Sequence, residues 1–134
     1  MTDGGGYSAA MAAPHLPELE RLAMEQVWER GEATVREVLD GLNAGRPAAP
    51  RAYTTVLTIM QRLEAKGMVE RRRRERADVY RAVLEREQYL GRRIDAEVSR
   101  LVEDFGELAL MQFARRVEAL DPERREALRR LGET

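Results

Sequence analysis

Three threonines and an arginine are spaced so that they could read DNA bases from one face of a helix. Thr55, Thr58 and Arg62 fall at positions i, i+3 and i+7 of a helix expected over residues 53–66, and Thr54 lies beside them. Threonine is a poor helix former, so stability gives no reason to prefer it at exposed positions. In a DNA major groove, however, threonine methyls can contact thymine methyls and arginine can pair with guanine. We therefore expect this face to read DNA, a merely polar surface being the alternative.

A run of arginines follows the threonine helix. Arg71 to Arg74 and Arg76 lie between two short strands expected at residues 68–69 and 79–80. The planar guanidinium group matches the oxygens of a DNA phosphate, so we interpret the run as a phosphate-binding hairpin. Acidic residues interrupt the run, and we expect only some of these arginines to contact DNA. A solvated hairpin tip is the alternative, but the position beside the threonine face favours DNA binding.

Other kinds of chemistry find little support in the sequence. His15 is the single histidine and there is no cysteine, which excludes disulfides, thiolate catalysis and zinc fingers and makes a histidine metal site implausible. No glycine-rich phosphate loop, nucleophile elbow or carboxylate–histidine cluster is present. We expect a protein that is not an enzyme and that uses no metal or cofactor.

The threonine helix needs partners to hold it, and apolar periodicity predicts them. A first helix is expected from Leu16 to a C-terminal cap at Gly31, and Thr34 with Glu37 forms a capping box that begins a second helix. Residues 43–50, rich in glycine and proline, are expected to form a loop. Three short helices followed by a two-stranded hairpin give the order of a winged helix-turn-helix. The predicted fold is therefore mainly α (α+β) with a small β-hairpin wing.

Three further amphipathic helices are expected from residue 85 to the end, the last beginning with Asp121 and Pro122. About fifty residues in three helices cannot enclose a core alone. Their apolar stripes look too wide for the small domain before them, so we predict a dimerisation region; packing back on the winged domain is the alternative. The predicted dimer contacts are Leu90, Ile94, Val98, Leu101, Phe105, Met111, Phe113 and Val117.

The charge distribution singles out the same central part of the chain. The 134 residues carry a net charge of −1, but residues 51–81 contain nine basic and four acidic side chains, a net +5. The sequence has no signal-peptide pattern and no apolar run of about 18 residues, so we expect a soluble, cytoplasmic protein. The predicted organisation is a disordered tail (1–15), a winged-helix DNA-binding domain (16–84) and a helical dimerisation region (85–134).

A characteristic string occupies the predicted threonine helix. It reads Arg51-Ala52-Tyr53-Thr54-Thr55-Val56-Leu57-Thr58 and continues through Arg62-Leu63 and Lys66-Gly67-Met68-Val69. It closely resembles the recognition helix of the BlaI/MecI penicillinase-repressor family, and the resemblance covers roughly residues 16–131. The DNA-contacting residues that it implies are Arg51, Tyr53, Thr54, Thr55, Thr58 and Arg62 in the recognition helix and Arg72, Arg73, Arg74 and Arg76 in the wing.

The resemblance also implies how such a protein works. Members of the family are dimeric repressors that bind inverted repeats containing TACA and TGTA, often upstream of their own gene and of a membrane sensor-protease gene. In staphylococcal-type members a protease cuts an Asn–Phe bond in the C-terminal region, and the matching position here is Gln112–Phe113, where glutamine replaces asparagine. Glu75 stands before Arg76 where many wings have glycine, so the turn is expected to differ. Related copper-responsive repressors carry C-terminal cysteine pairs, which this chain lacks.

The sequence therefore predicts a homodimeric DNA-binding repressor of transcription. The resemblance to the family further implies control of β-lactam-resistance or cell-envelope-stress genes and relief by a membrane sensor-protease. Two alternatives stay open. The arginine run could bind an acidic protein partner, or a small ligand could bind between the two domains. A DNA titration separates the first alternative from the prediction, and a thermal-shift screen with small molecules tests the second.

Overall fold

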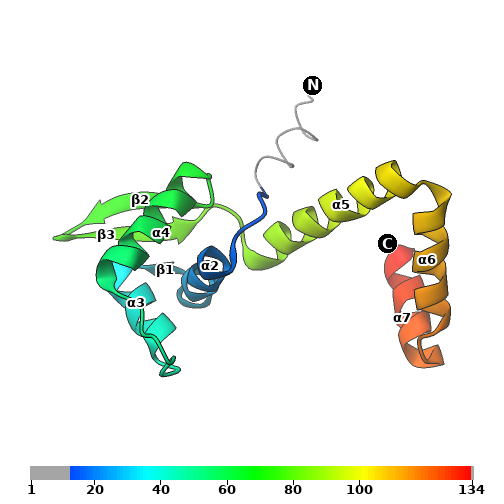
Figure 1. The fold of residues 1–134 in the computed structure, drawn as a ribbon, viewed down its shortest axis with the longest axis horizontal. Coiled ribbons are helices and arrows are strands. Elements are labelled where there is room, and N and C mark those ends of the chain that lie inside the picture. The colour runs from blue at the N-terminus through cyan, green and yellow to red at the C-terminus, as the bar shows by residue number, and fades with distance from the viewer. Residues whose placement is uncertain (1–12, 134) are drawn as a thin grey trace. The chain divides into compact units, whose positions relative to one another are not determined.

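The computed structural model describes residues 13–133, and the chain divides into two units between Ile94 and Asp95, within helix α5. Most of it is helical, with one small antiparallel sheet, which confirms the predicted fold class. The first unit contains α2 (Glu18–Arg30), β1 (Glu32–Ala33), α3 (Val35–Asn43), α4 (Tyr53–Ala65), β2 (Val69–Arg74), β3 (Ala77–Ala82) and the start of α5 (Arg86–Phe105) (Figure 1). The second contains the rest of α5, α6 (Glu107–Glu118) and α7 (Pro122–Gly132).

The ends of α2, α3 and α4 follow from local chemistry, as predicted. Helix α2 stops at Gly31, whose φ of 85° is readily adopted only by glycine. Thr34 begins α3 through the predicted capping box: its hydroxyl accepts from the Glu37 amide at 3.1 Å, and the Glu37 carboxylate accepts from the Thr34 amide at 2.9 Å. Helix α4 ends just before Gly67, which has a φ of 79°.

The sheet has the order β1–β3–β2, with both pairs antiparallel. The predicted strands at 68–69 and 79–80 were too short, because β2 and β3 continue through the charged residues and pair up to Arg74 opposite Ala77. Only Glu75 and Arg76 are left to form the turn. The two residues of β1 were not predicted, since a strand of that length has no periodicity to detect.

A single core holds the first unit together. Val27 of α2, Val38 of α3, Met60 of α4 and Tyr80 of β3 are all buried in it. The predicted disordered tail (1–15) lies outside the described residues except for its last three, and of these Ala13 is buried in the core. The core therefore begins a few residues earlier than the apolar pattern suggested.

Trp28 is half-buried against the core and joins the end of α2 to the start of α5. Its indole N–H donates to the carbonyl of Leu84 at 2.9 Å, and its ring centroid lies 5.5 Å from that of Tyr89. The Tyr89 hydroxyl in turn donates to the carbonyl of Pro14 at 2.6 Å. Burial raises the pKa of Tyr89. These contacts fix the first turns of α5 on the first unit.

A buried carboxylate ties α2 to the end of α4. Glu20 is only 3% exposed, and its carboxylate is paired with the ammonium group of Lys66. A buried carboxylate without a partner would be strongly destabilising, so this ion pair fixes how α2 and α4 meet. Glu20 lies four residues after Leu16 and three before Ala23, on the buried side of α2, but its charge predicts an exposed side chain.

The second unit begins α7 as predicted but encloses no core. The Asp121 carboxylate accepts from the Arg124 amide at 2.9 Å and Pro122 opens the helix. Among residues 95–133, only Ala109 is buried. No helix in the described part of the chain is long and apolar enough to cross a membrane. The large apolar side chains exposed on this unit are Val98, Leu101, Phe105, Leu108, Leu110, Met111, Val117, Leu128 and Leu131.

Candidate nucleic-acid interface

Helix α4 presents the predicted threonine face to solvent. Its inward side is formed by Val56, Ile59, Met60 and Leu63, which are all buried in the core. The residues predicted to read DNA are all exposed, at the start of the helix and along its outer face: Arg51, Tyr53, Thr54, Thr55, Thr58 and Arg62.

The threonines are not equivalent as hydrogen-bonding groups. The Thr58 hydroxyl donates to the carbonyl of Thr54, four residues earlier, at 3.1 Å. Its proton is therefore used within the helix, and Thr58 retains a methyl group and hydroxyl lone pairs for a partner. Thr55 has no such bond within the described residues, so its hydroxyl can both donate to and accept from a base or phosphate.

The start of α4 is open to an anionic partner. Its N-cap residue, Ala52, has no side chain that could accept from the first amides, so the positive end of the helix is uncapped. Arg51, which directly precedes Ala52, is held by Asn43 at the end of α3. The Asn43 side-chain N–H donates to the Arg51 carbonyl at 3.1 Å, and the Asn43 side-chain oxygen accepts from the Arg51 amide at 2.9 Å. This pair of bonds fixes the direction from which the chain enters α4.

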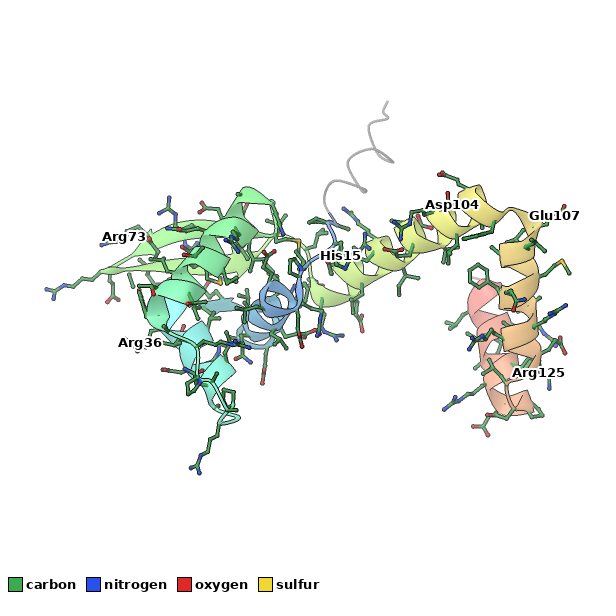
Figure 2. All side chains as sticks on the ribbon, in the orientation of Figure 1. His15, Arg36, Arg73, Asp104, Glu107 and Arg125 are labelled. Atoms are coloured by element: carbon green, nitrogen blue, oxygen red, sulfur yellow. The ribbon has the colours of Figure 1, made fainter. Side chains whose placement is uncertain are left out.

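A groove of about 260 Å³ joins the start of α4 to the hairpin and to α3. Arg36, Arg73 and Arg76 line it together with Tyr53, and the Arg36 guanidinium stacks 5.3 Å from the centre of the Tyr53 ring. Figure 2 shows Arg36 on α3 and Arg73 on the hairpin, toward the same edge of the first unit. Three guanidinium groups around an uncapped helix start suit an anion such as a DNA phosphate.

The hairpin arginines do not act as one group, because strand alternation divides them between two faces of the sheet. Arg71 and Arg73 reach Asp78 at 3.4 and 3.3 Å, and Arg71 also reaches Glu64 of α4 at 3.5 Å. These acidic neighbours, Glu64 first, raise the pKa of Arg71.

On the other face of the sheet, Glu32 holds two of the predicted wing residues. Its carboxylate lies 3.5 Å from Arg72 and 2.7 Å from Arg74. Of the four arginines predicted to contact DNA from the wing, the structure therefore brings Arg73 and Arg76 to the groove beside α4. It pairs Arg72 and Arg74 with Glu32 instead.

The predicted dimer contacts fall into two groups. Leu90 packs against the core of the first unit. Most of the others are exposed, and Phe113 is half-buried in a groove of about 250 Å³ that it shares with Leu101 and Phe105. The predicted cleavage position, Gln112–Phe113, lies within α6, with Gln112 exposed.

Sequence reasoning missed two residues of this interface, Arg36 and Asn43. Neither belongs to a motif, because each acts through a contact with a residue at least eight positions away, which spacing on one helix does not reveal. The sequence predicted no metal site because it contains one histidine and no cysteine. Among residues 13–133, no three potential ligands are grouped so as to hold a metal ion, and His15 is exposed.

Comparison with known proteins gives consistent matches over most of the chain. The family model described as penicillinase repressor matches residues 16–133. The transcriptional regulator BlaI of Mycobacterium tuberculosis (strain ATCC 25618 / H37Rv) is 40% identical over 119 residues, covering 86% of this chain and 80% of the relative.

Two solved structures are also similar to the chain. They are the DNA-binding domain of the repressor BlaI, with a TM-score of 0.49, and monomeric Bacillus licheniformis BlaI in complex with the blaP half-operator, with a TM-score of 0.47. Each is 22% identical and covers 57% of this chain and 90% of the solved chain.

Proposed function

Because the chain belongs to the penicillinase repressor family, we propose that it represses transcription by binding double-stranded DNA through α4 and the β2–β3 hairpin. The observation that carries this proposal is the exposed threonine face of α4, with its uncapped start beside an arginine-lined groove. The similar proteins of Mycobacterium tuberculosis are transcriptional regulators, which supports the proposal.

In this proposal α4 is the recognition helix and lies in the major groove. Thr54, Thr55 and Thr58 offer methyl and hydroxyl groups to base edges, and Arg62, one turn beyond Thr58, offers a bidentate donor for guanine. The uncapped start of α4, with Arg51 and Tyr53, faces the sugar-phosphate backbone. These contacts would set register and sequence preference together.

Phosphate contacts come from the groove beside α4. We assign them to Arg73 and Arg76 of the hairpin and add Arg36 of α3, because the three line one surface with Tyr53. Arg72 and Arg74 are less suited to the same phosphates, since Glu32 holds both on the other face of the sheet.

The second unit would supply a homodimer interface. Leu101, Phe105 and Met111 are among its many exposed apolar residues, and only Ala109 is buried among residues 95–133. Such a surface is costly in water and is stabilised when a second copy covers it. A two-fold pair of subunits would place two α4 helices in successive major grooves, which suits an inverted repeat of the TACA/TGTA type.

Relief of repression by a membrane sensor-protease, as in family members, would act on this second unit. Gln112 and Phe113 lie in the middle of α6. A protease generally binds an extended segment, so α6 would have to unwind before this bond could be cut. Cleavage there would separate much of the apolar surface from the DNA-binding unit, and β-lactam-resistance or cell-envelope genes would be expressed.

Hydroxyl-radical footprinting on a duplex with a TACA/TGTA inverted repeat tests the proposal. A dimer that reads DNA with two α4 helices should protect two patches whose centres lie about 10 bp apart. One patch alone would contradict the dimer. Uniform weak protection would contradict sequence reading and would favour the acidic-partner alternative for the arginine run.

A further inference from the structure

One carboxylate holds two arginines of the hairpin on the face that lies toward α4. Asp78 of β3 stands directly opposite Arg73 of β2 in the sheet register, and its two oxygens reach Arg73 at 3.3 Å and Arg71 at 3.4 Å. Asp78 is less exposed than either arginine: its side chain is 30% exposed, against 67% for Arg73 and 50% for Arg71. The carboxylate also lines the groove beside α4.

A carboxylate in this position competes with a phosphate for the same guanidinium donors. Both anions accept the paired N–H groups of arginine, so Arg73 can bind a DNA phosphate fully only if it weakens its bond to Asp78. The carboxylate also places a negative charge in the groove that a phosphate would enter. Each effect reduces the favourable free energy of backbone contacts without altering the base-reading face of α4.

We propose, on the basis of the proposed function, that Asp78 limits the sequence-independent DNA affinity of the protein by occupying Arg71 and Arg73. Such a limit has a use, because a genome offers a vast excess of non-specific sites that compete for a repressor. A weaker hold on ordinary DNA leaves more of the protein available for its operator. Sequence reading by α4 then accounts for a larger share of the total affinity.

The other face of the sheet provides a matched control. Glu32 holds Arg72 and Arg74 as Asp78 holds Arg71 and Arg73, and it is similarly exposed, at 27%. Glu32 does not line the groove beside α4. Asp78→Asn and Glu32→Gln therefore remove the same charge, and each removes a carboxylate that two arginines share, but on opposite faces. Arg71 keeps its second acidic neighbour, Glu64, so Arg73 is the arginine that Asp78→Asn frees.

The experiment measures binding of the full chain to a scrambled duplex by fluorescence anisotropy at physiological salt. At this salt concentration charges are screened over about 8 Å, so an effect of a charge inside the groove can be distinguished from an effect of the protein's net charge. We expect Asp78→Asn to tighten binding by about fivefold, in line with the size of exposed ion pairs, and to steepen the salt dependence by part of one phosphate contact per subunit. Glu32→Gln should change the affinity by less than about twofold.

A second variant links the gain to its cause. In Asp78→Asn combined with Arg73→Ala, most of the fivefold gain should disappear, because the arginine that was freed is gone. Circular dichroism melts of each variant should show that the fold is retained. Asp78→Asn and Glu32→Gln are nearly isosteric, and Arg73 is exposed. If Asp78→Asn proved unfolded, the salt slope of Asp78→Ser would take its place.

The outcomes separate this inference from the proposed function. Equal tightening by Asp78→Asn and Glu32→Gln would overturn the inference in favour of a simple net-charge effect, and so would no tightening by Asp78→Asn. In both cases a preference of the unaltered protein for the inverted repeat would leave the proposed function intact. No binding of the unaltered protein to any duplex would overturn both.

Discussion

The position of each arginine along the hairpin determines which face of the sheet it lies on and which carboxylate it pairs with. Four of them stand in a row from Arg71 to Arg74 and are alike in sequence, yet alternate ones belong to opposite faces of the sheet. The sequence could predict that only some would contact DNA, because acidic residues interrupt the run. It could not predict which, because the strand, and with it the alternation, extends further than the apolar pattern shows.

Arg73→Ala should reduce the salt dependence of DNA binding by part of one phosphate contact per subunit, because Asp78 competes with a phosphate for the Arg73 guanidinium group. Arg73 lines the groove beside α4, and alanine carries no positive charge to replace it there. Anisotropy titrations from low to moderate salt measure the slope. Arg72→Ala, on the face held by Glu32, is the matched control and should leave the slope nearly unchanged. If the two variants changed the slope equally, the division of the hairpin into two faces would have no bearing on DNA.

Glu75→Gly should stabilise the protein by about 0.5 kcal/mol. Glu75 opens the two-residue turn with a φ of 57°, a left-handed conformation that costs a non-glycine residue about 1–2 kcal/mol and glycine little. The greater freedom of glycine in the unfolded chain offsets part of the gain. Urea unfolding measures the difference, and Glu75→Ala controls for loss of the carboxylate. A glycine variant no more stable than the alanine variant would show that the turn is not strained.

At the scale of elements, the sequence predicted the helices better than the sheet. The capping box at Thr34 and the cap at Gly31 are local signals, and both helix ends lie where those residues predicted. Strand β1 depends on pairing with β3, which is distant in sequence. The outer halves of β2 and β3 pair across a two-residue turn, but their charged residues show no apolar alternation. The burial of the charged Glu20 side chain likewise depends on Lys66, which lies 46 residues away. Such features cannot be derived from periodicity along one segment.

Asn43→Ala should loosen the entry to α4 while leaving the rest of the unit folded. Two hydrogen bonds to the backbone of Arg51 are lost, so we expect a loss of about 1 kcal/mol in stability. DNA binding should weaken by about fivefold, because the start of α4 must then be ordered on binding.

Hydrogen exchange at the Arg51 amide measures the effect of Asn43→Ala directly and should become faster. Asn43→Asp is the control, since it keeps the acceptor for that amide and loses only the donor. Weaker DNA binding with unchanged exchange at Arg51 would mean that Asn43 acts in some other way than by holding the entry to α4.

At the scale of the whole molecule, we expect a dimer because the second unit exposes many apolar residues. Phe105→Glu should weaken self-association by about 30-fold or more, since Phe105 is a large apolar residue, 59% exposed, beside the groove of α5 and α6. Sedimentation equilibrium measures the change. Val83→Glu, at a 46% exposed apolar residue of the first unit, is the control and should leave self-association unchanged. Equal effects of the two variants would contradict an interface in the second unit.

The most direct test of the whole account is anisotropy binding of the unaltered protein and of Thr55→Ala to a TACA/TGTA inverted repeat and to its scrambled counterpart. If α4 reads DNA sequence, the unaltered protein should prefer the repeat by about 10³ or more at physiological salt. Thr55→Ala should reduce binding to the repeat by about 1–3 kcal/mol and leave binding to the scrambled duplex nearly unchanged. Equal affinity of the unaltered protein for both duplexes, or an equal loss on both with Thr55→Ala, would contradict the claim that α4 reads DNA sequence.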